Sequence, residues 1–202
     1  MGFESSVEKD VEKSKPKGDM GKNPLFVEAQ NNEIFFYSDV IEESVFKLVK
    51  ELKKVEAGIL HRSVLDDREP APLVIRINSG GGYVTDGFLA MDAIKRCRVP
   101  VTTVVEGCCA SAATFLSLAG NKRVMTPNSV MLIHQMSGCS WGKYYELVDE
   151  MKNARLFMKM IRAVYKEGTS IPKKDLARIL KHDLWFDAKK CLKYGLVDEI
   201  LD

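Results

Sequence analysis

Apolar residues follow two different spacings along this chain. Short runs of consecutive or alternating apolar residues predict strands, and apolar residues recurring every three or four positions predict helices. The strands are expected at residues 34–37, 73–77, 101–105, 122–125, 130–133 and 196–200. The helices are expected at residues 41–56, 86–97, 112–119 and 143–166, with two shorter ones opened by Pro172 and Asp187. Because strands alternate with helices, the pattern predicts an α/β fold with right-handed crossovers.

Two segments lack this periodicity. Residues 1–23 alternate Glu, Asp and Lys with few large apolar residues, which predicts a mobile N-terminal arm and not a domain. Residues 57–72 are rich in charge and contain two prolines, which predicts a loop. Residues 24–202 are therefore expected to form a single domain.

Composition narrows the function classes. Apolar residues make up 46% and charged residues 29%, and the net charge is only +2, so we expect neither a disordered chain nor a nucleic-acid partner. We also expect no membrane span, because no apolar run reaches about 18 residues, and no secretion signal, because the N-terminus lacks a basic stretch followed by an apolar one. The five cysteines form no C-x-x-C pair, which favours reduced thiols and a cytoplasmic location.

A run of three glycines follows the strand predicted at 73–77. Gly80, Gly81 and Gly82 allow the backbone to approach a ligand closely and to expose its N–H groups. A plain flexible turn explains the same run. The run fits neither the G-x-G-x-x-G fingerprint nor a Walker loop, so phosphate binding has no support from a motif.

Ser111 opens the small-residue helix that follows the strand predicted at 101–105. A serine at this position lies near the positive end of a helix and beside free N–H groups, which suits a nucleophile and a developing oxyanion. A serine N-cap is an equally ordinary explanation. The surrounding residues do not form the G-x-S-x-G motif, which disfavours an α/β-hydrolase.

His134 ends the apolar strand predicted at 130–133 and is the best candidate for a general base. His61 lies in the charged segment, and His182 is the weaker candidate beside Asp183. Taken alone, His134 is as easily a structural histidine, and Asp183 a loop residue. Cys109, two residues before Ser111, is a possible thiolate nucleophile, although its apolar neighbours favour an inert buried thiol.

Four segments in order resemble the signatures of the ClpP peptidase family: INSGGG at 77–82, ASA at 110–112, PNSVMLIHQ at 127–135 and YGLVD at 194–198. The resemblance covers roughly residues 33–202. It implies the spiral of βαβ units shared by ClpP and crotonase folds, with a protruding helix–strand handle at about 136–166. It also implies a serine endopeptidase that cleaves unfolded polypeptides and small peptides inside an oligomeric chamber.

The same resemblance assigns roles to individual residues. It makes Ser111 the nucleophile, His134 the general base and Asp183 the residue that orients the histidine, and it assigns the two oxyanion-hole N–H groups to Gly82 and Ala112. An extended substrate would bind between two segments, whose residues are Tyr83 and Val84 on one side and Gln135, Met136 and Ser137 on the other.

The family resemblance also implies partners. It predicts two stacked heptameric rings of this chain and, as the proteolytic subunit of an ATP-dependent protease, an AAA+ unfoldase of the Clp type. No metal or cofactor is expected in this chain, because ATP would be used by the unfoldase.

Several residues depart from the family pattern. Gly80 stands where proline is usual, Ala112 replaces a larger residue, and His182 replaces an arginine that joins neighbouring subunits. Residues 1–23 do not resemble the family's axial loop, which in the family helps to dock the unfoldase. The alternatives are a crotonase-type acyl-CoA enzyme, a capsid-maturation or signal-peptide peptidase of related fold, and a catalytically silent ring subunit.

Overall fold

The structure is a computed structural model and describes residues 26–201. The predicted arm at 1–23 lies outside the described residues. Strands within the described part form one eight-stranded sheet, with the order β1-β2-β3-β4-β5-β8 and with β6 and β7 branching from β4. Their bounds are β1 Phe26–Gln30, β2 Glu33–Tyr37, β3 Leu73–Ser79, β4 Val101–Ala110, β5 Lys122–Met125, β6 Val130–Leu132, β7 Trp185–Asp187 and β8 Glu199–Ile200.

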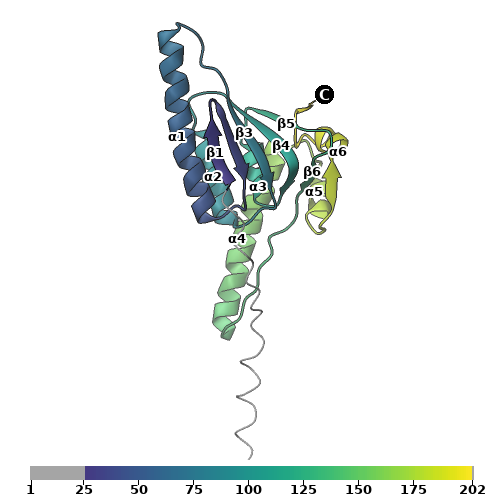
Figure 1. Cartoon of the computed structure of the whole chain (residues 1–202). Coiled ribbons are helices and arrows are strands. Elements are labelled where there is room, and N and C mark those ends of the chain that lie inside the picture. Colours follow the sequence, from purple (N-terminus) through teal and green to yellow (C-terminus); the bar gives the residue numbers. More distant parts are fainter. Residues whose placement is uncertain (1–25, 202) are drawn as a thin grey trace, which may run out of the picture.

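Helices connect the parallel strands and cover the sheet (Figure 1). Their bounds are α1 Glu42–Leu65, α2 Val84–Lys95, α3 Ala113–Leu118, α4 Tyr144–Gly168, α5 Lys173–Ile179 and α6 Ala188–Lys193. Strands β2 to β5 and β8 run parallel, while β1 pairs with β2, and β7 with β6, in the antiparallel sense. The predicted α/β class is confirmed.

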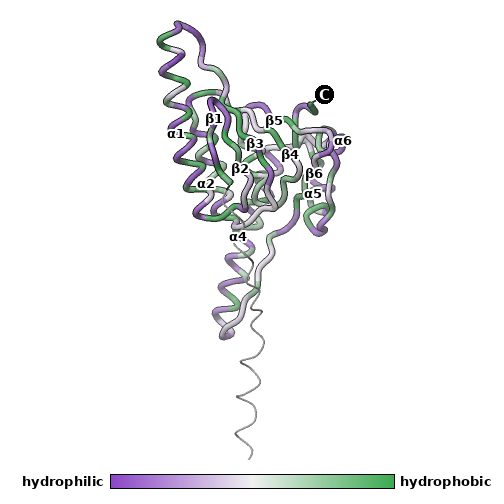
Figure 2. Tube along the Cα trace, viewed as in Figure 1, coloured by the Kyte–Doolittle hydropathy of each residue, from purple (hydrophilic) through white to green (hydrophobic). Residues whose placement is uncertain are grey.

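The core lies between the sheet and its helices. Strand β3 buries alternate residues, Leu73, Ile75 and Ile77, as expected for a strand with one face on the core. Helix α1 buries one stripe, and Figure 2 shows its hydrophilic and hydrophobic residues alternating along its length. Because β2, β3, β4, β5 and β6 run parallel, their carboxyl ends lie at the same edge of the sheet.

Helix α1 is longer than its sequence pattern predicted. The charged segment 57–72 was expected to be a loop, but residues 57–65 continue the helix and only residues 66–72 connect it to β3. The reason is Ile59, which follows Val55 at helical spacing and is 1% exposed. His61 consequently lies on α1 and is exposed. Figure 1 shows the end of α1 extending beyond the sheet.

Helix α4 projects from the body, and the segment that leads into it runs alongside (Figure 1). Only Ile161 and Tyr165 of α4 are buried, both in its C-terminal half. The helix part of the predicted handle is thus present. The strand expected in the handle is absent, because residues 133–143 have no strand partner within the described chain.

Among the helices of residues 26–201, none combines the length and the apolar character that crossing a bilayer requires.

Candidate active site

Ser111 lies in the sharp turn between β4 and α3. Its backbone has φ +53°, a left-handed conformation that costs roughly 1–2 kcal/mol for a residue with a Cβ. The turn is held by two hydrogen bonds: the Ser111 N–H donates to the Leu132 carbonyl at 2.8 Å, and the Ser111 carbonyl accepts from the Thr114 N–H at 3.0 Å. A strained strand-to-helix turn of this kind exposes a serine hydroxyl above the sheet.

His134 reaches Ser111 because β6 lies parallel to β4. The register pairs Ala110 with Leu132, so the residues that follow these two leave the sheet together. His134 Nε2 lies 2.9 Å from Ser111 Oγ. This contact joins two side chains 23 residues apart in the sequence.

Asp183 reaches the same histidine through β7, a strand that the sequence pattern did not predict. The antiparallel register pairs Leu132 with Trp185, and continuing it by two residues places His134 opposite Asp183. The Gln135 N–H donates to the Leu180 carbonyl at 2.7 Å, which ties the two segments together. His134 Nδ1 lies 2.6 Å from Asp183 Oδ1.

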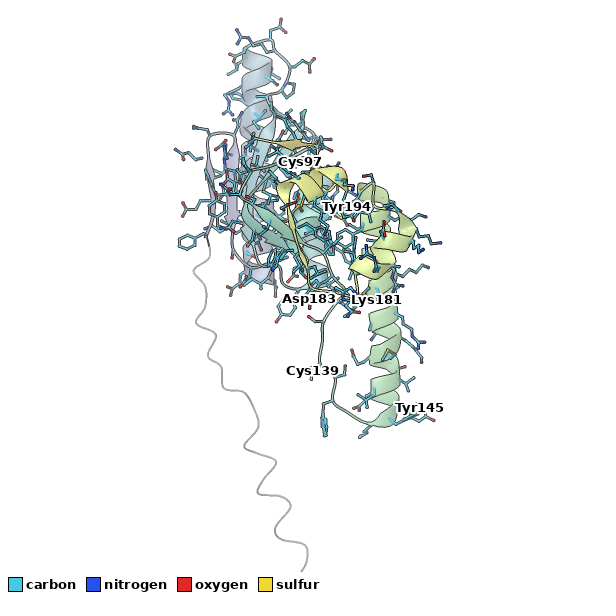
Figure 3. The ribbon with its side chains drawn as sticks, turned by 90° about the vertical axis from the view of Figure 1, so that its right-hand side faces the viewer. Cys97, Cys139, Tyr145, Lys181, Asp183 and Tyr194 are labelled. Atoms are coloured by element: carbon cyan, nitrogen blue, oxygen red, sulfur yellow. The ribbon has the colours of Figure 1, made fainter. Side chains whose placement is uncertain are left out.

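These contacts define the tautomer of His134. A carboxylate only accepts hydrogen bonds, so Nδ1 carries the proton and donates to Asp183, which leaves Nε2 free to accept from the Ser111 hydroxyl. The side chain of Asp183 is 76% exposed, against 20% for His134. Figure 3 shows Asp183 where the chain leaves the body toward Cys139.

The glycine-rich turn packs directly against Ser111. A Cβ on Gly81 would lie 2.7 Å from both the Ala110 carbonyl oxygen and Ser111 Cβ, and Gly81 has φ +100°. A Cβ on Gly82 would lie 2.2 Å from the Val40 carbonyl oxygen. The family resemblance implied Gly82 as a donor, but no role was predicted for Gly81, which permits this close approach; the glycine run itself was the available signal.

The two predicted oxyanion donors lie on opposite sides of this contact. Gly82 follows Gly81, and the Ala112 N–H is the first amide after Ser111. Neither N–H donates to another group within residues 26–201. The Ala112 nitrogen would be 3.3 Å from a Cβ on Gly81, so the two amides border the same small region beside the serine.

The predicted substrate-binding residues differ in what they can offer. The Tyr83 N–H donates to the Val40 carbonyl and its own carbonyl accepts from the Gly87 N–H, so Tyr83 presents an exposed side chain but an occupied backbone. The N–H of Gln135 is likewise used, and that of Met136 points to Met158 Sδ at 3.3 Å. Val84 is half-buried and Ser137 exposed.

The cysteine alternative finds no support in this geometry. Cys109 is fully buried, and burial raises the pKa of its thiol well above the ordinary value. Burial also raises the pKa of Cys108, whose Sγ contacts Asn78 Oδ1 at 3.4 Å. Both ring nitrogens of His134 are engaged by Ser111 and Asp183, and His182 is exposed to solvent.

Within residues 26–201, no three His, Cys, Asp or Glu side chains are arranged to hold a metal ion.

Comparison with known proteins identifies this chain as a peptidase and gives its family. Residues 28–202 match the model of the Clp protease family, and the chain belongs to that family. The ATP-dependent Clp protease proteolytic subunit 1 of Chlamydia caviae is 34% identical over 172 residues, covering 83% of this chain and 85% of that protein.

A second relative and a solved structure support the same family assignment. The ATP-dependent Clp protease proteolytic subunit of Pleurastrum terricola is 32% identical over 171 residues, covering 84% of this chain and 83% of that protein. A solved structure of a ClpP1 point mutant from Listeria monocytogenes superimposes with a TM-score of 0.73 at 26% identity, covering 85% of this chain and 92% of that one. The ClpP-type fold and the family are thereby confirmed, and the comparisons do not favour the acyl-CoA alternative.

Proposed function

We propose that this chain is a serine endopeptidase that cleaves unfolded polypeptides and small peptides. The observation that carries the proposal is the contact between Ser111 Oγ and His134 Nε2 at 2.9 Å. A serine hydroxyl is a weak nucleophile until an adjacent base removes its proton. His134, oriented through its other nitrogen by Asp183, meets that requirement.

In the acylation step, Ser111 Oγ bonds to the carbonyl carbon of the scissile peptide while its proton passes to His134 Nε2. The tetrahedral intermediate then collapses, the carbon–nitrogen bond breaks, and the imidazolium returns the Nε2 proton to the departing amine. Water attacks the acyl-enzyme in the same manner: His134 takes a proton from the water and gives it to Ser111 Oγ. Asp183 stabilises the imidazolium throughout and stays ionised.

The negative charge that develops on the carbonyl oxygen needs donors that require no rearrangement. The N–H groups of Gly82 and Ala112 are the candidates, since both are free of other partners within the described residues and border Ser111. Loss of one such donor typically costs about 2.7–4 kcal/mol of barrier. The segments around Tyr83–Val84 and Gln135–Ser137 are proposed to hold the substrate in extended form between them.

We further propose that copies of this chain assemble into two stacked heptameric rings that enclose the sites. Support comes from large apolar side chains exposed on α4 and just before it, which need a covering partner. They are Trp141, Tyr144, Tyr145, Leu147, Met151 and Leu156. Static light scattering of the active protein should give an oligomer of this size; a monomer would contradict the assembly.

The remaining expectations follow from the family. An AAA+ unfoldase of the Clp type is proposed as the partner that consumes ATP, so this chain itself would need neither nucleotide nor metal. A cytoplasmic location is proposed because all five cysteines are free thiols, which suits a reducing compartment.

The test is covalent labelling with a fluorophosphonate followed by mass spectrometry of the adduct. The phosphonyl group should be found on Ser111, and the labelled protein should no longer hydrolyse a fluorogenic peptide. A thiol alkylator serves as the control and should leave the peptidase active. Inhibition by the alkylator alone, with no adduct on Ser111, would overturn the proposal.

A further inference from the structure

A hydroxyl pair lies directly beneath Ser111. Thr114 Oγ1 lies 2.6 Å from the Ser111 carbonyl oxygen and 2.7 Å from the hydroxyl of Tyr165. Thr114 is on α3 and Tyr165 on α4, and their exposures are 0% and 1%. The contact therefore links the turn that holds Ser111 to the buried half of the projecting helix, away from water.

The direction of this chain of hydrogen bonds follows from counting protons. In the contact between Thr114 Oγ1 and the Ser111 carbonyl oxygen, the single hydroxyl proton of Thr114 must be the one shared, because the carbonyl has none of its own. The Tyr165 hydroxyl must then be the donor to Thr114 Oγ1. Burial raises the pKa of Tyr165, which keeps the phenol protonated and able to donate. Tyr165 thus donates to Thr114, and Thr114 to the Ser111 carbonyl.

The carbonyl held in this way belongs to the peptide group that also carries the Ala112 N–H. A trans peptide is planar, so its C=O and N–H point in opposite directions. Fixing the Ser111 carbonyl toward Thr114 accordingly aims the Ala112 N–H away from the core, on the side of Gly81. Ser111 has φ +53°, so this orientation is held against a backbone preference and needs such an anchor.

We propose that Thr114 and Tyr165 are positioning residues for the oxyanion donor of this site. Two hydrogen bonds, from the N–H and the hydroxyl of Thr114, fix the Ser111–Ala112 peptide, and Tyr165 fixes the Thr114 hydroxyl. The inference rests on the proposed function, because it assigns the Ala112 N–H a role in the reaction. An ordinary buried tyrosine that merely satisfies its hydroxyl is the alternative.

The experiment measures the rate of fluorophosphonate labelling and peptide hydrolysis in the full-length protein carrying single substitutions. Thr114→Val keeps the side-chain shape without the hydroxyl. It should lower the labelling rate and kcat about tenfold, with KM unchanged. This is less than the loss expected when an oxyanion donor is missing altogether, because the Ala112 N–H is still present. Tyr165→Phe should lower both about threefold, since it acts through a second hydrogen bond. Thr114→Ser keeps the hydroxyl and should restore the wild-type rate.

The double variant Thr114→Val/Tyr165→Phe separates positioning from packing. If Tyr165 acts through Thr114, the double variant should label no more slowly than Thr114→Val alone. The matched control is Ser117→Ala on the same helix, because Ser117 Oγ is buried without a hydrogen-bond partner in the described chain. This control should label at the wild-type rate.

The outcomes distinguish failure of the positioning role from failure of the proposed function. Wild-type rates in Thr114→Val and Tyr165→Phe, with only the unfolding midpoint lowered, would overturn the positioning role and leave the proposed function intact. Absence of a Ser111 adduct in the wild type would overturn both. If Thr114→Val does not fold, Tyr165→Phe and Thr114→Ser still decide the matter: slower labelling in the first and an unchanged rate in the second support the inference, and any other pattern contradicts it.

Discussion

Ser111 and Asp183 contact opposite sides of the same imidazole, yet the two sides are built in different ways. Ser111 follows a ten-residue, mostly buried strand, is held by hydrogen bonds to Leu132 and Thr114, and lies against Gly81. Asp183 precedes a three-residue strand and has a side chain that is 76% exposed. The proposed nucleophile is thus held by the buried core, and the proposed orienting carboxylate by an exposed segment at the edge of the sheet.

This difference indicates where precision is needed. The oxygen that attacks the substrate must stand within a fraction of an ångström of its reactive position. A carboxylate that orients a histidine acts one residue away from the reacting atoms. Water at an exposed carboxylate also screens its charge and replaces part of its function. We therefore expect substitutions on the Ser111 side to cost more activity than those on the Asp183 side.

The largest effect is expected for Ser111→Ala. Removing the nucleophile of a serine peptidase lowers kcat by about 10⁶-fold, and here it should leave the fold unchanged. Hydrolysis of a fluorogenic peptide measures the loss, and circular dichroism checks the fold. Retained turnover in a folded variant would remove Ser111 from the role.

Asp183→Asn should lower kcat by about 10³-fold, less than the loss of about 10⁴-fold typical of a buried triad aspartate, because water reaches this carboxylate. The matched control is Asp175→Asn on the neighbouring helix α5, whose carboxylate forms an ion pair with Arg178 and should not affect kcat. A loss as large as that for Ser111→Ala would mean that assembly shields Asp183, and the contrast drawn above would no longer hold.

Gly81→Ala should lower kcat by about 10²-fold, since displacing a reacting group by about 1 Å has a cost of that order. The added methyl would meet Ser111 Cβ at 2.7 Å, at a φ that alanine rarely adopts. Gly80→Ala is the control, because the nearest atom to a Cβ there is Asp39 Oδ1 at 3.9 Å. Equal activity of the two variants would show that the glycine-rich turn does not position the serine.

The smallest effect concerns Asp198, an exposed carboxylate held for structure and not for catalysis. Hydrogen bonds from the Arg123 side chain lower the pKa of Asp198. A lowered pKa in the folded state stabilises the fold above the ordinary value of about 3.9, and this stabilisation disappears as pH falls through the folded value. Asp198→Asn should cost about 1 kcal/mol or less at pH 7.

Chemical denaturation at pH 7 and at low pH tests this expectation. The stability difference between wild type and Asp198→Asn should vanish at low pH, while kcat stays unchanged at neutral pH. Asp183→Asn should behave in the opposite way, with little change in stability and a large change in kcat. A fall in kcat for Asp198→Asn would contradict a purely structural role for Asp198.

Local spacing along the chain was enough to predict the α/β class, the strands at 73–77 and 122–125, and most of each helix, because these features depend on neighbours within a few residues. It failed at residues 57–65, where charge masked the single buried residue Ile59. Local spacing also failed to predict β1 and β7, because these short segments are stabilised as strands only by pairing with β2 and β6.

In the candidate site, too, some features could be predicted from the sequence and others depend on the tertiary structure. The sequence supplied the residue types and, through their order, the family; each residue alone had an ordinary structural explanation. Their convergence depends on the parallel register of β4 with β6 and the antiparallel register of β6 with β7. Those registers arise from hydrogen bonds between segments far apart in the chain, and so do the left-handed turn at Ser111 and its anchor at Tyr165. Periodicity carries no information about such contacts, because they are selected by the packing of the whole sheet.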